Sequence, residues 1–285
     1  KEVSASVAVA RPGLDLRQVL PRWREEAIAC LEQQARAEND QPLFLYLALT
    51  APHTPWLPHE RFQGKSGAGM YGDFMLQVDD FVGEVMEALR RLDMKQNTLV
   101  IFTSDNGPVW YAKDRKRFDH ASTAGYRGMK GDIWEGGHRM PFVVRWPDKI
   151  PAGATSDQLL NFTDLFATLA AVVDQPLPNS AAPDSVNLLP ALLGQAEEPL
   201  RTETVHVGAE SLALRSGDWK WIPTPGSGGF IDRPELKKAQ QQNMPPGQLY
   251  NLAEDPSEQV NLYHQKPQKR GALKAKLKRM REQSE

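Results

Sequence analysis

Leu99–Gly107, with the sequence LVIFTSDNG, decides the fold, because a continuous apolar run ends there in two oxygen-bearing side chains and a glycine. An apolar run rich in β-branched and aromatic residues is typical of a strand that is covered on both faces. In open α/β sheets, ligands bind beyond the carboxyl ends of such strands. The stretch therefore predicts a buried strand that ends in a site. The alternative is a simple turn, since Asp, Asn and Gly also dominate turns.

Asp105 and Asn106 stand at the end of this predicted strand. A carboxylate beside an amide carbonyl is a pair of hard oxygen donors, which suits Ca²⁺ or Mg²⁺ better than zinc. The two residues are therefore predicted metal ligands.

Helical and extended patterns alternate along the first two thirds of the chain. Gly69–Leu92 keeps a 3.6-residue apolar period, so one face of a long helix is expected to pack on a sheet. The other predicted elements are a helix over Leu16–Glu38, strands over Pro42–Leu49, Leu99–Ser104 and Pro141–Trp146, and a helix over Asp164–Val173. The polar loop that runs from the central strand to Gly131 is long enough to suggest a function.

The pattern changes to short strands from about Thr202 onward. These predicted strands cover residues 204–207, 212–215, 219–222 and 248–252, and strands in close succession favour an antiparallel sheet. The predicted fold class is α/β, with a mainly parallel central sheet that is flanked by helices and incomplete at its N-terminal side. A smaller C-terminal subdomain of antiparallel sheet and helix follows. The predicted boundary divides the chain into residues 1–195 and 196–285.

Composition excludes several classes of protein. The chain has 285 residues, 40% hydrophobic and 25% charged, which suits a globular core of one or two domains. A formal net charge of −2 gives no basis for nucleic-acid binding, and no apolar run approaches the ~20 residues that span a membrane. The basic stretch Lys266–Arg281 alternates with apolar residues and is predicted to be a solvated amphipathic helix. The single cysteine, Cys30, lies in a helical pattern, which favours packing over nucleophilic catalysis.

Four segments together resemble the type I sulfatases of the alkaline phosphatase superfamily. Three of them stand in the family's order and spacing, and a fourth resembles the end of its C-terminal subdomain. They are Ala51–Trp56 (APHTPW), Thr103–Gly107 (TSDNG), Arg127–Pro141 (RGMKGDIWEGGHRMP) and Leu249–Leu262 (LYNLAEDPSEQVNL). The resemblance covers the chain from about Leu14 to Tyr263. It implies that residues 1–195 are the C-terminal part of the catalytic domain.

The resemblance also implies roles for individual residues. His53 and Lys130 match the family's histidine and lysine that contact the substrate sulfate. Lys130 is a point cation between glycines, and His53, between two prolines, could donate to a sulfate oxygen or protonate the leaving group. Asp105 and Asn106 match two of the family's four metal ligands, which implies Ca²⁺, with Mg²⁺ as an alternative. His120 lies in the loop that lines the family's pocket and is a weaker candidate for substrate contact.

Two family motifs are absent from the chain. Members carry a paired-aspartate metal motif and a Cys-x-Pro-Ser-Arg type motif whose cysteine becomes formylglycine, the nucleophile. Neither occurs here, because Cys30 is followed by Leu-Glu-Gln-Gln. We therefore expect the formylglycine only in a segment outside this chain, and we expect the chain alone to be inactive. Missing strands would leave an exposed sheet edge, which suggests self-association.

The resulting functional prediction is a sulfuric ester hydrolase that acts on small-molecule or saccharide sulfate esters. The glycine-rich context of Lys130 and Glu135-Gly136-Gly137 favours sulfate over phosphate. The alternatives are a phosphate mono- or diester hydrolase of the same superfamily and a noncatalytic fragment. Glu135, the two glycines and Arg139 are predicted to have structural roles, with Arg139 tied to a neighbouring carboxylate. The family implies a periplasmic, secreted or lysosomal location, with the bacterial periplasm favoured.

Overall fold

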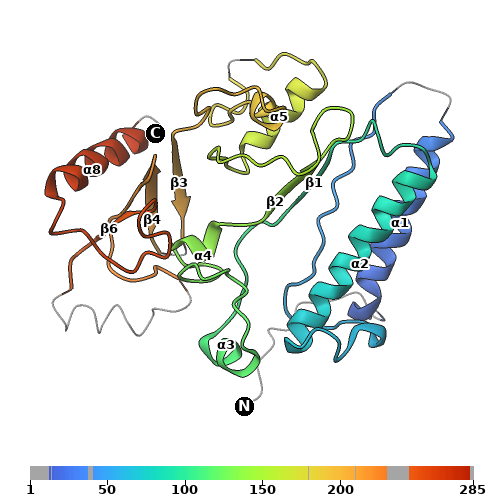
Figure 1. Ribbon diagram of the computed structural model, residues 1–285, viewed down its shortest axis with the longest axis horizontal. Helices are drawn as coiled ribbons and strands as arrows, with labels where there is room; N and C mark the ends of the chain where they lie inside the picture. Colours follow the sequence, from blue (N-terminus) through green and yellow to red (C-terminus); the bar gives the residue numbers. More distant parts are fainter. Residues whose placement is uncertain are drawn as a thin grey trace. The chain divides into compact units, whose positions relative to one another are not determined.

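The computed structural model describes residues 13, 15–37, 41–178, 180–208, 210–229 and 244–282 (Figure 1). The chain divides into two compact units, Lys1–Thr98 and Leu99–Glu285. The predicted boundary near residue 195 falls inside the second unit and stays a prediction.

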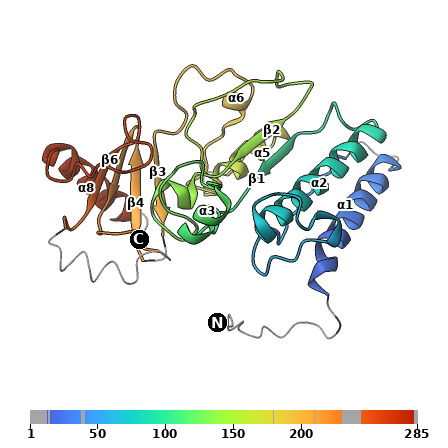
Figure 2. The ribbon, with the colours of Figure 1, turned by 60° about the horizontal axis from the view of Figure 1, so that its bottom comes forward.

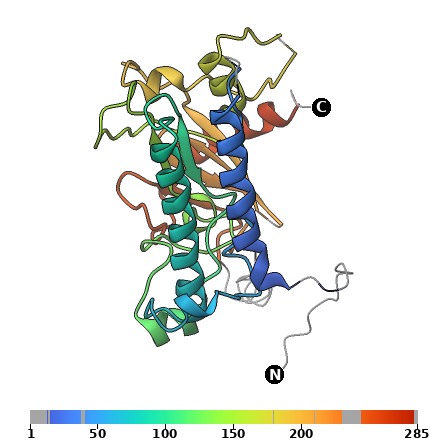
Figure 3. The same cartoon turned by 90° about the vertical axis from the view of Figure 1, so that its right-hand side faces the viewer.

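Two long helices lie side by side in the first unit (Figure 3). They are α1 (Val19–Ala35), preceded by a 3-10 turn at Leu16–Gln18, and α2 (Gly69–Arg91), preceded by a 3-10 turn at Glu60–Phe62. The ion pairs Arg24–Glu84 (3.2 Å) and Arg91–Glu32 (2.8 Å) follow one another in the same order along both helices, so the helices run in the same direction. Their buried apolar residues recur with helical spacing: Leu20, Ala27 and Leu31 on α1, and Phe74, Val78, Phe81 and Leu89 on α2. Both predicted helices are confirmed, except that Glu38 lies outside the described residues.

The chain between these helices corrects one prediction. Residues 42–49 are extended, but they form no β-ladder with any described residue, so the predicted strand is not a strand of a sheet. Their side chains nevertheless alternate as in a strand, since Phe44 and Tyr46 are 73% and 67% exposed while the leucines at the alternate positions 43, 45, 47 and 49 are half-buried. The sequence pattern predicted this alternation of burial correctly, but a sheet also requires a hydrogen-bonded neighbouring strand.

The second unit begins with a two-stranded sheet. β1 (Val100–Thr103) pairs with β2 (Phe142–Arg145) in antiparallel register, with Ile101 opposite Val144. The predicted mainly parallel sheet is not confirmed, because every strand pair in the described residues is antiparallel. β1 is half-buried along its length, not fully buried as predicted. The connection from β1 to β2 contains α3 (Ala112–Phe118) and α4 (Glu135–His138), and α5 (Asp164–Val172) and α6 (Leu189–Leu192) follow β2.

The second sheet has four antiparallel strands in chain order. They are β3 (Glu203–Val207), β4 (Leu212–Ser216), β5 (Trp219–Ile222) and β6 (Gln248–Asn251). The helix α8 (Pro267–Glu282) lies against this sheet (Figure 2). The predicted C-terminal antiparallel sheet and helix are therefore confirmed. No helix in the described part of the chain is both long and apolar enough to cross a membrane.

The two faces of this sheet pack against different partners. Leu273 and Leu277 of α8 pack with Leu214, Trp221 and Leu249 on one face. Successive side chains of a strand point to opposite faces, and the neighbouring positions Ala213, Ile222 and Tyr250 accordingly pack with Ile133 and Trp134. This second face thus holds the segment that leads into α4.

Candidate active site

Lys130 lies in a tight loop whose backbone is fixed to the end of β1. Its backbone N–H donates to the Pro108 carbonyl at 2.9 Å, which joins the Lys130 loop to the chain just beyond Asp105 and Asn106. The next residue, Gly131, has φ of +83°, a left-handed conformation in which glycine is favoured. The Lys130 side chain is half-buried. The structure therefore brings the predicted sulfate-contacting lysine and the predicted metal ligands onto adjacent backbone segments.

The short helix α4 supports both of these segments. The Gly107 N–H donates to the Gly137 carbonyl at 2.8 Å, and the Gly136 N–H donates to the Arg127 carbonyl at 2.7 Å. Gly107 approaches so closely that a Cβ added to it would lie 1.9 Å from the Gly136 carbonyl oxygen. The glycines of the Glu-Gly-Gly sequence thus allow backbone to pack directly on backbone.

A buried ion network anchors α4 to the C-terminal sheet. The Lys220 ammonium of β5 donates to Glu135 Oε1 at 2.9 Å and lies 3.0 Å from Glu258 Oε1. The Glu135 backbone N–H donates to Glu258 Oε2 at 2.5 Å. The side chains of Lys220, Glu135 and Glu258 are at most 2% exposed. Arg139 lies 3.6 Å from Glu135 Oε2, so the carboxylate that was predicted to hold this arginine belongs to the same motif.

The two carboxylates of the network differ in acidity. Burial works to raise the pKa of Glu135, but the charge and hydrogen bond of Lys220 outweigh burial and lower this pKa to about 2. Burial dominates at Glu258 and raises its pKa, although Lys220 and the Glu135 amide oppose the rise. Glu135 is therefore the firmly ionised partner of Lys220.

Arg127 ties the same motif to the C-terminal segment. Its guanidinium lies 3.6 Å from the centre of the Trp134 ring and donates to the Glu258 carbonyl at 2.9 Å. The Trp134 indole N–H donates to Gln248 Oε1, which also accepts from the Tyr250 hydroxyl at 2.7 Å. The loop that carries Lys130 is therefore bounded on both sides by residues that are fixed to β6 and the turn after it.

Two neutral histidines lie beside the network. The rings of His138 and His206 are 4.3 Å apart between centroids, and His138 Nε2 is 2.7 Å from the Ile133 carbonyl. Burial, with the nearby charge of Lys220, lowers the pKa of His138 to about 4. Burial and the neighbouring His138 lower the pKa of His206 well below its usual value. Both rings are therefore uncharged at neutral pH.

Acidification should destabilise the second unit through this pair. Because the folded-state pKa values lie below the unfolded value of 6.5, the stabilisation is fully present above that pH and is lost as the pH falls toward 4. His138 alone accounts for roughly 3 kcal/mol over this range. We expect the Tm of His206→Phe to fall less between pH 7 and pH 4 than the Tm of the unmodified chain, because phenylalanine takes up no proton. Lys220, Glu135 and Arg215 also act on His206, but Glu135 titrates mainly below pH 4. An equal loss of Tm in both proteins would contradict the assignment.

His53 and His120 lie at exposed positions. His53 belongs to the first unit, where its Nδ1 is 2.7 Å from the Thr54 carbonyl. Because a carbonyl only accepts, Nδ1 donates in this contact, and Nε2 is then an acceptor in the neutral ring and a donor only in the imidazolium. His120 belongs to the second unit, at the far end of α3, where the buried Trp110 donates to its carbonyl at 2.7 Å and its ring packs edge-on to the indole. The roles of both histidines stay predictions.

Asp105 and Asn106 can supply only part of a calcium site. Asp105 is exposed, and the Asn106 amide nitrogen donates to Asp105 Oδ1 at 2.6 Å. The oxygens fit a hard cation chemically, but Ca²⁺ takes about six to eight oxygen ligands. Among the described residues, no group of three or more His, Cys, Asp or Glu side chains is placed to hold a metal ion. Further ligands would have to come from elsewhere.

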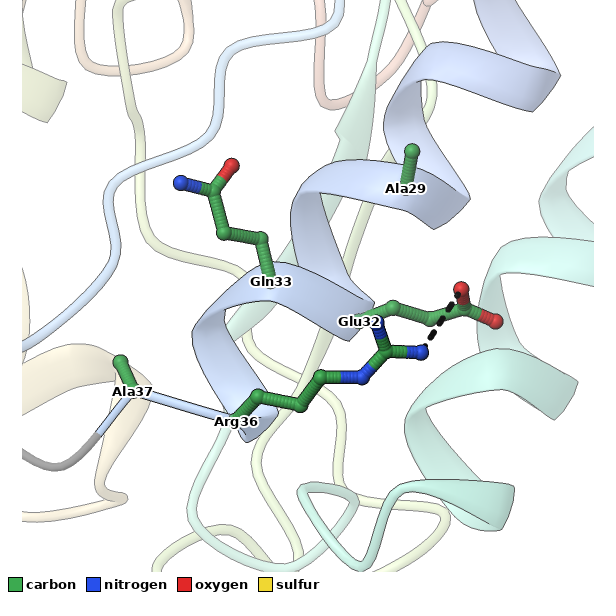
Figure 4. A pocket seen from close by; sticks show the side chains of 5 residues that line it. All are labelled: Ala29, Glu32, Gln33, Arg36 and Ala37. Atoms are coloured by element: carbon green, nitrogen blue, oxygen red, sulfur yellow. Dashed lines mark ion pairs between the residues drawn. The ribbon is translucent and has the colours of Figure 1, made fainter.

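A surface pocket in the first unit lacks the features of a catalytic centre. It is formed by one stretch of α1 and the turn after it, where Arg36 lies 3.8 Å from Glu32 (Figure 4). Its other lining residues are Ala29, Gln33 and Ala37. It contains no nucleophile and a single carboxylate that is paired to arginine, so it does not resemble a catalytic centre.

Sequence reasoning missed Lys220 and Glu258. A signal existed for Lys220, because a lysine between two tryptophans in a short strand faces the side of the sheet that Ile222 also faces, and Ile222 is fully buried. Glu258 lies in the Asp-Pro segment that resembles the family, but nothing in that segment indicates a buried carboxylate.

Comparison with known proteins identifies the class. Residues 21–175 match the family model named Sulfatase. The chain is 38% identical over 262 residues to an N-acetylgalactosamine-6-O-sulfatase of Bacteroides thetaiotaomicron, covering 86% of this chain and 49% of that protein. It is 33% identical over 261 residues to human arylsulfatase A, covering 88% of this chain and 49% of that protein.

A solved structure shows the same relationship. A sulfatase described with the metabolism of multiple glycosaminoglycans by Bacteroides thetaiotaomicron superimposes with a TM-score of 0.82 at 36% identity, covering 94% of this chain and 55% of that one. The chain belongs to the sulfatase family, as a type I sulfatase of the alkaline phosphatase superfamily. It spans about half the length of the curated relatives it matches.

Proposed function

We propose that this chain supplies the sulfate-binding residues and part of the metal site of a sulfuric ester hydrolase. The observation that carries the proposal is the hydrogen bond from the Lys130 N–H to the Pro108 carbonyl at 2.9 Å, which places a cation-bearing loop beside Asp105 and Asn106. The substrate we propose is a saccharide or other small-molecule sulfate ester. The names of the relatives, one of them an N-acetylgalactosamine-6-O-sulfatase, support this substrate class.

Hydrolysis of a sulfate monoester requires charge neutralisation and proton transfer. In the proposed mechanism the Lys130 ammonium neutralises negative charge on the sulfate oxygens as the ester bond breaks. His53, with a proton on Nε2 as well as on Nδ1, donates its Nε2–H to a sulfate oxygen or transfers that proton to the leaving oxygen. Ca²⁺, held in part by Asp105 and Asn106, would add positive charge at the sulfate oxygens. The nucleophile, a formylglycine, is proposed to come from a segment outside these residues.

The alternative function is hydrolysis of phosphate mono- or diesters within the same superfamily. Matched p-nitrophenyl sulfate and p-nitrophenyl phosphate separate the two, because they share a leaving group and differ in the transferred group. We expect the protein that carries both this chain and the nucleophile segment to release nitrophenol faster from the sulfate. A preference for the phosphate ester would contradict the proposal.

The purified 285-residue chain should be silent on p-nitrophenyl sulfate in excess Ca²⁺. No formylglycine motif occurs in its sequence, so no covalent route is available to it. The measurement is nitrophenol release by the chain, with Lys130→Ala as the matched variant. Turnover above background that Lys130→Ala abolishes would show that a nucleophile resides in this chain.

Calcium should bind the chain weakly and through Asp105. Two protein oxygens leave most of the coordination shell to water, so we expect an affinity near the millimolar range of loosely built sites, ~10⁻³ M. Calorimetric titration of Ca²⁺ should show further weakening in Asp105→Ala, while Asp119→Ala, which removes another exposed carboxylate of the same connection, should change little. Equal affinities for Asp105→Ala and the unmodified chain would remove Asp105 from the ligand set.

A further inference from the structure

The helix α8 concentrates positive charge in a chain that is otherwise acidic. Between Pro267 and Glu282 it carries seven lysines and arginines and one glutamate, a net charge of +6. Because the whole chain has a net charge of −2, the remainder has a net charge of −8. Charge asymmetry of this size creates a local field that can select a partner of opposite sign.

The packing of α8 holds this charge in a fixed orientation. Leu273 and Leu277 are each 5% exposed and lie in the apolar cluster with Leu214, Trp221 and Leu249. Cation–π contacts add to this attachment on the same helix, since Lys269 lies 5.2 Å from the centre of the Trp219 ring and Arg270 lies 4.2 Å from that of Tyr263. One face of α8 is therefore held against the β3–β6 sheet (Figure 2), which leaves the opposite face of the helix exposed.

The outward basic residues form one stripe. Lys274, Lys278 and Arg281 are exposed and stand at positions i, i+4 and i+7, which lie on one face of a helix. The stripe spans about 10 Å along the axis. Within the described residues, Lys274 and Arg281 have no ion-pair partner, and Lys278 has only the exposed Glu282 at 3.6 Å. By contrast, Lys276 on the flank of the helix is paired with Glu203.

The composition of the exposed face narrows the kind of partner. None of the large apolar side chains of α8 is exposed, so the helix has nothing to insert into a membrane interface. It also carries no aromatic residue on which a nucleic-acid base could stack. A linear polyanion that needs neither insertion nor stacking fits this surface by charge alone.

We propose that the Lys274–Lys278–Arg281 stripe of α8 binds an acidic polysaccharide, a chain of sugars with repeated sulfate or carboxylate groups. The choice of a polysaccharide rests on the proposed function. For a polymer long enough to reach from α8 to the opposite face of the β3–β6 sheet, this second contact would raise the effective concentration of its sulfate esters near the candidate site. The stripe is thus a binding surface for substrates longer than those that the active site holds.

The test is binding of chondroitin sulfate to the purified chain, measured by titration calorimetry at low ionic strength. The triple variant K274Q/K278Q/R281Q should bind at least ~10-fold more weakly, because it removes three exposed ion-pairing groups. The matched control is K113Q/R115Q/K116Q, which removes the same charge from exposed residues of α3 and should stay within about twofold of the unmodified chain. Binding should fall as salt rises, and uncharged dextran should not bind.

Several results would overturn the proposal. They are an absence of chondroitin sulfate binding by the unmodified chain, unchanged binding by the α8 variant, and equal losses in the α8 and α3 variants. Tighter binding to phosphatidylserine vesicles or single-stranded DNA, lost in the α8 variant, would assign the stripe to a different partner class and also overturn it.

A measurement on the unmodified chain guards against misfolding of the variant. Chondroitin sulfate should protect Lys274 and Lys278 from acetylation, detected by mass spectrometry, and leave Lys113 and Lys116 reactive. Equal acetylation of Lys274 and Lys278 with and without the polymer would show that the stripe does not bind it. The two proposals can fail separately. An absence of sulfate ester hydrolysis would overturn the proposed function, whereas the α8 proposal is tested by binding of the polymer, which requires no turnover.

Discussion

Lys220→Met is expected to lower the free energy of unfolding of the second unit by about 3–5 kcal/mol, the usual cost of removing one partner from a buried ion pair. The ammonium is fully buried between Glu135 and Glu258, at 2.9 and 3.0 Å. Its loss leaves two buried carboxylates facing one another, and methionine matches its volume without its charge. The measurement is urea-induced unfolding followed by the fluorescence of the tryptophans.

A matched control and a second variant sharpen this test. Lys278→Met makes the same change at a side chain that is 77% exposed. We therefore expect it to lower the free energy of unfolding by less than about 0.5 kcal/mol. Glu258→Gln in the Lys220→Met background should recover part of the loss, since it removes one of the uncompensated charges. If the free energy of unfolding of Lys220→Met stays within about 1 kcal/mol of that of the unmodified chain, the network is not a principal anchor of α4.

The network also shows where sequence reasoning stops. Lys220 and Glu135 are separated by 85 positions, and Glu135 and Glu258 by 123. Local periodicity reports which face of a strand or helix is apolar, but it carries no information about which distant charges meet. The antiparallel strands β3 to β6 and the helix α8 were predictable because each has its own local pattern and β3, β4 and β5 are consecutive along the chain.

Two misses in the first half of the fold have different causes. Residues 42–49 have the composition and the alternation of a strand, yet a strand depends on a partner that the segment itself does not specify. The helix α3 went unpredicted because AKDRKRF is charged almost throughout and has no apolar period. The buried Trp110, which packs near Phe118 and His120, holds α3 through contacts that no periodicity reveals.

The motif residues of the candidate site could be selected from the sequence, but the residues that support them could not. Lys130, Asp105 and Asn106 were chosen from local motifs, and the backbone hydrogen bonds now join their segments through Pro108 and α4. The support beneath them could not be foreseen, because it is made by the turn after β6 and by β5. The residues that are proposed to do chemistry thus belong to short local motifs, whereas the residues that position those motifs are distant in sequence.

Lys130→Ala is expected to lower kcat/KM for a sulfate ester by ~10²-fold or more in a protein that carries both this chain and the proposed nucleophile segment. The ammonium is the proposed counter-charge for the sulfate oxygens, and alanine leaves that developing charge unopposed. The Lys130 loop is held through its backbone, by the hydrogen bond to Pro108 and the left-handed turn at Gly131. The variant should therefore keep its fold and lose turnover, which unfolding and kinetic measurements on one preparation can separate.

Lys113→Ala is the matched control, because Lys113 is an exposed lysine in the same connection between β1 and β2. Its turnover should stay within about twofold, the ordinary range for a surface substitution. Lys130→Arg keeps the positive charge but replaces a point cation by a planar fork, so a rate between those of the alanine variant and the unmodified enzyme is expected. Normal turnover in Lys130→Ala, with the fold intact, would remove Lys130 from the active site and leave its loop as a structural turn on α4.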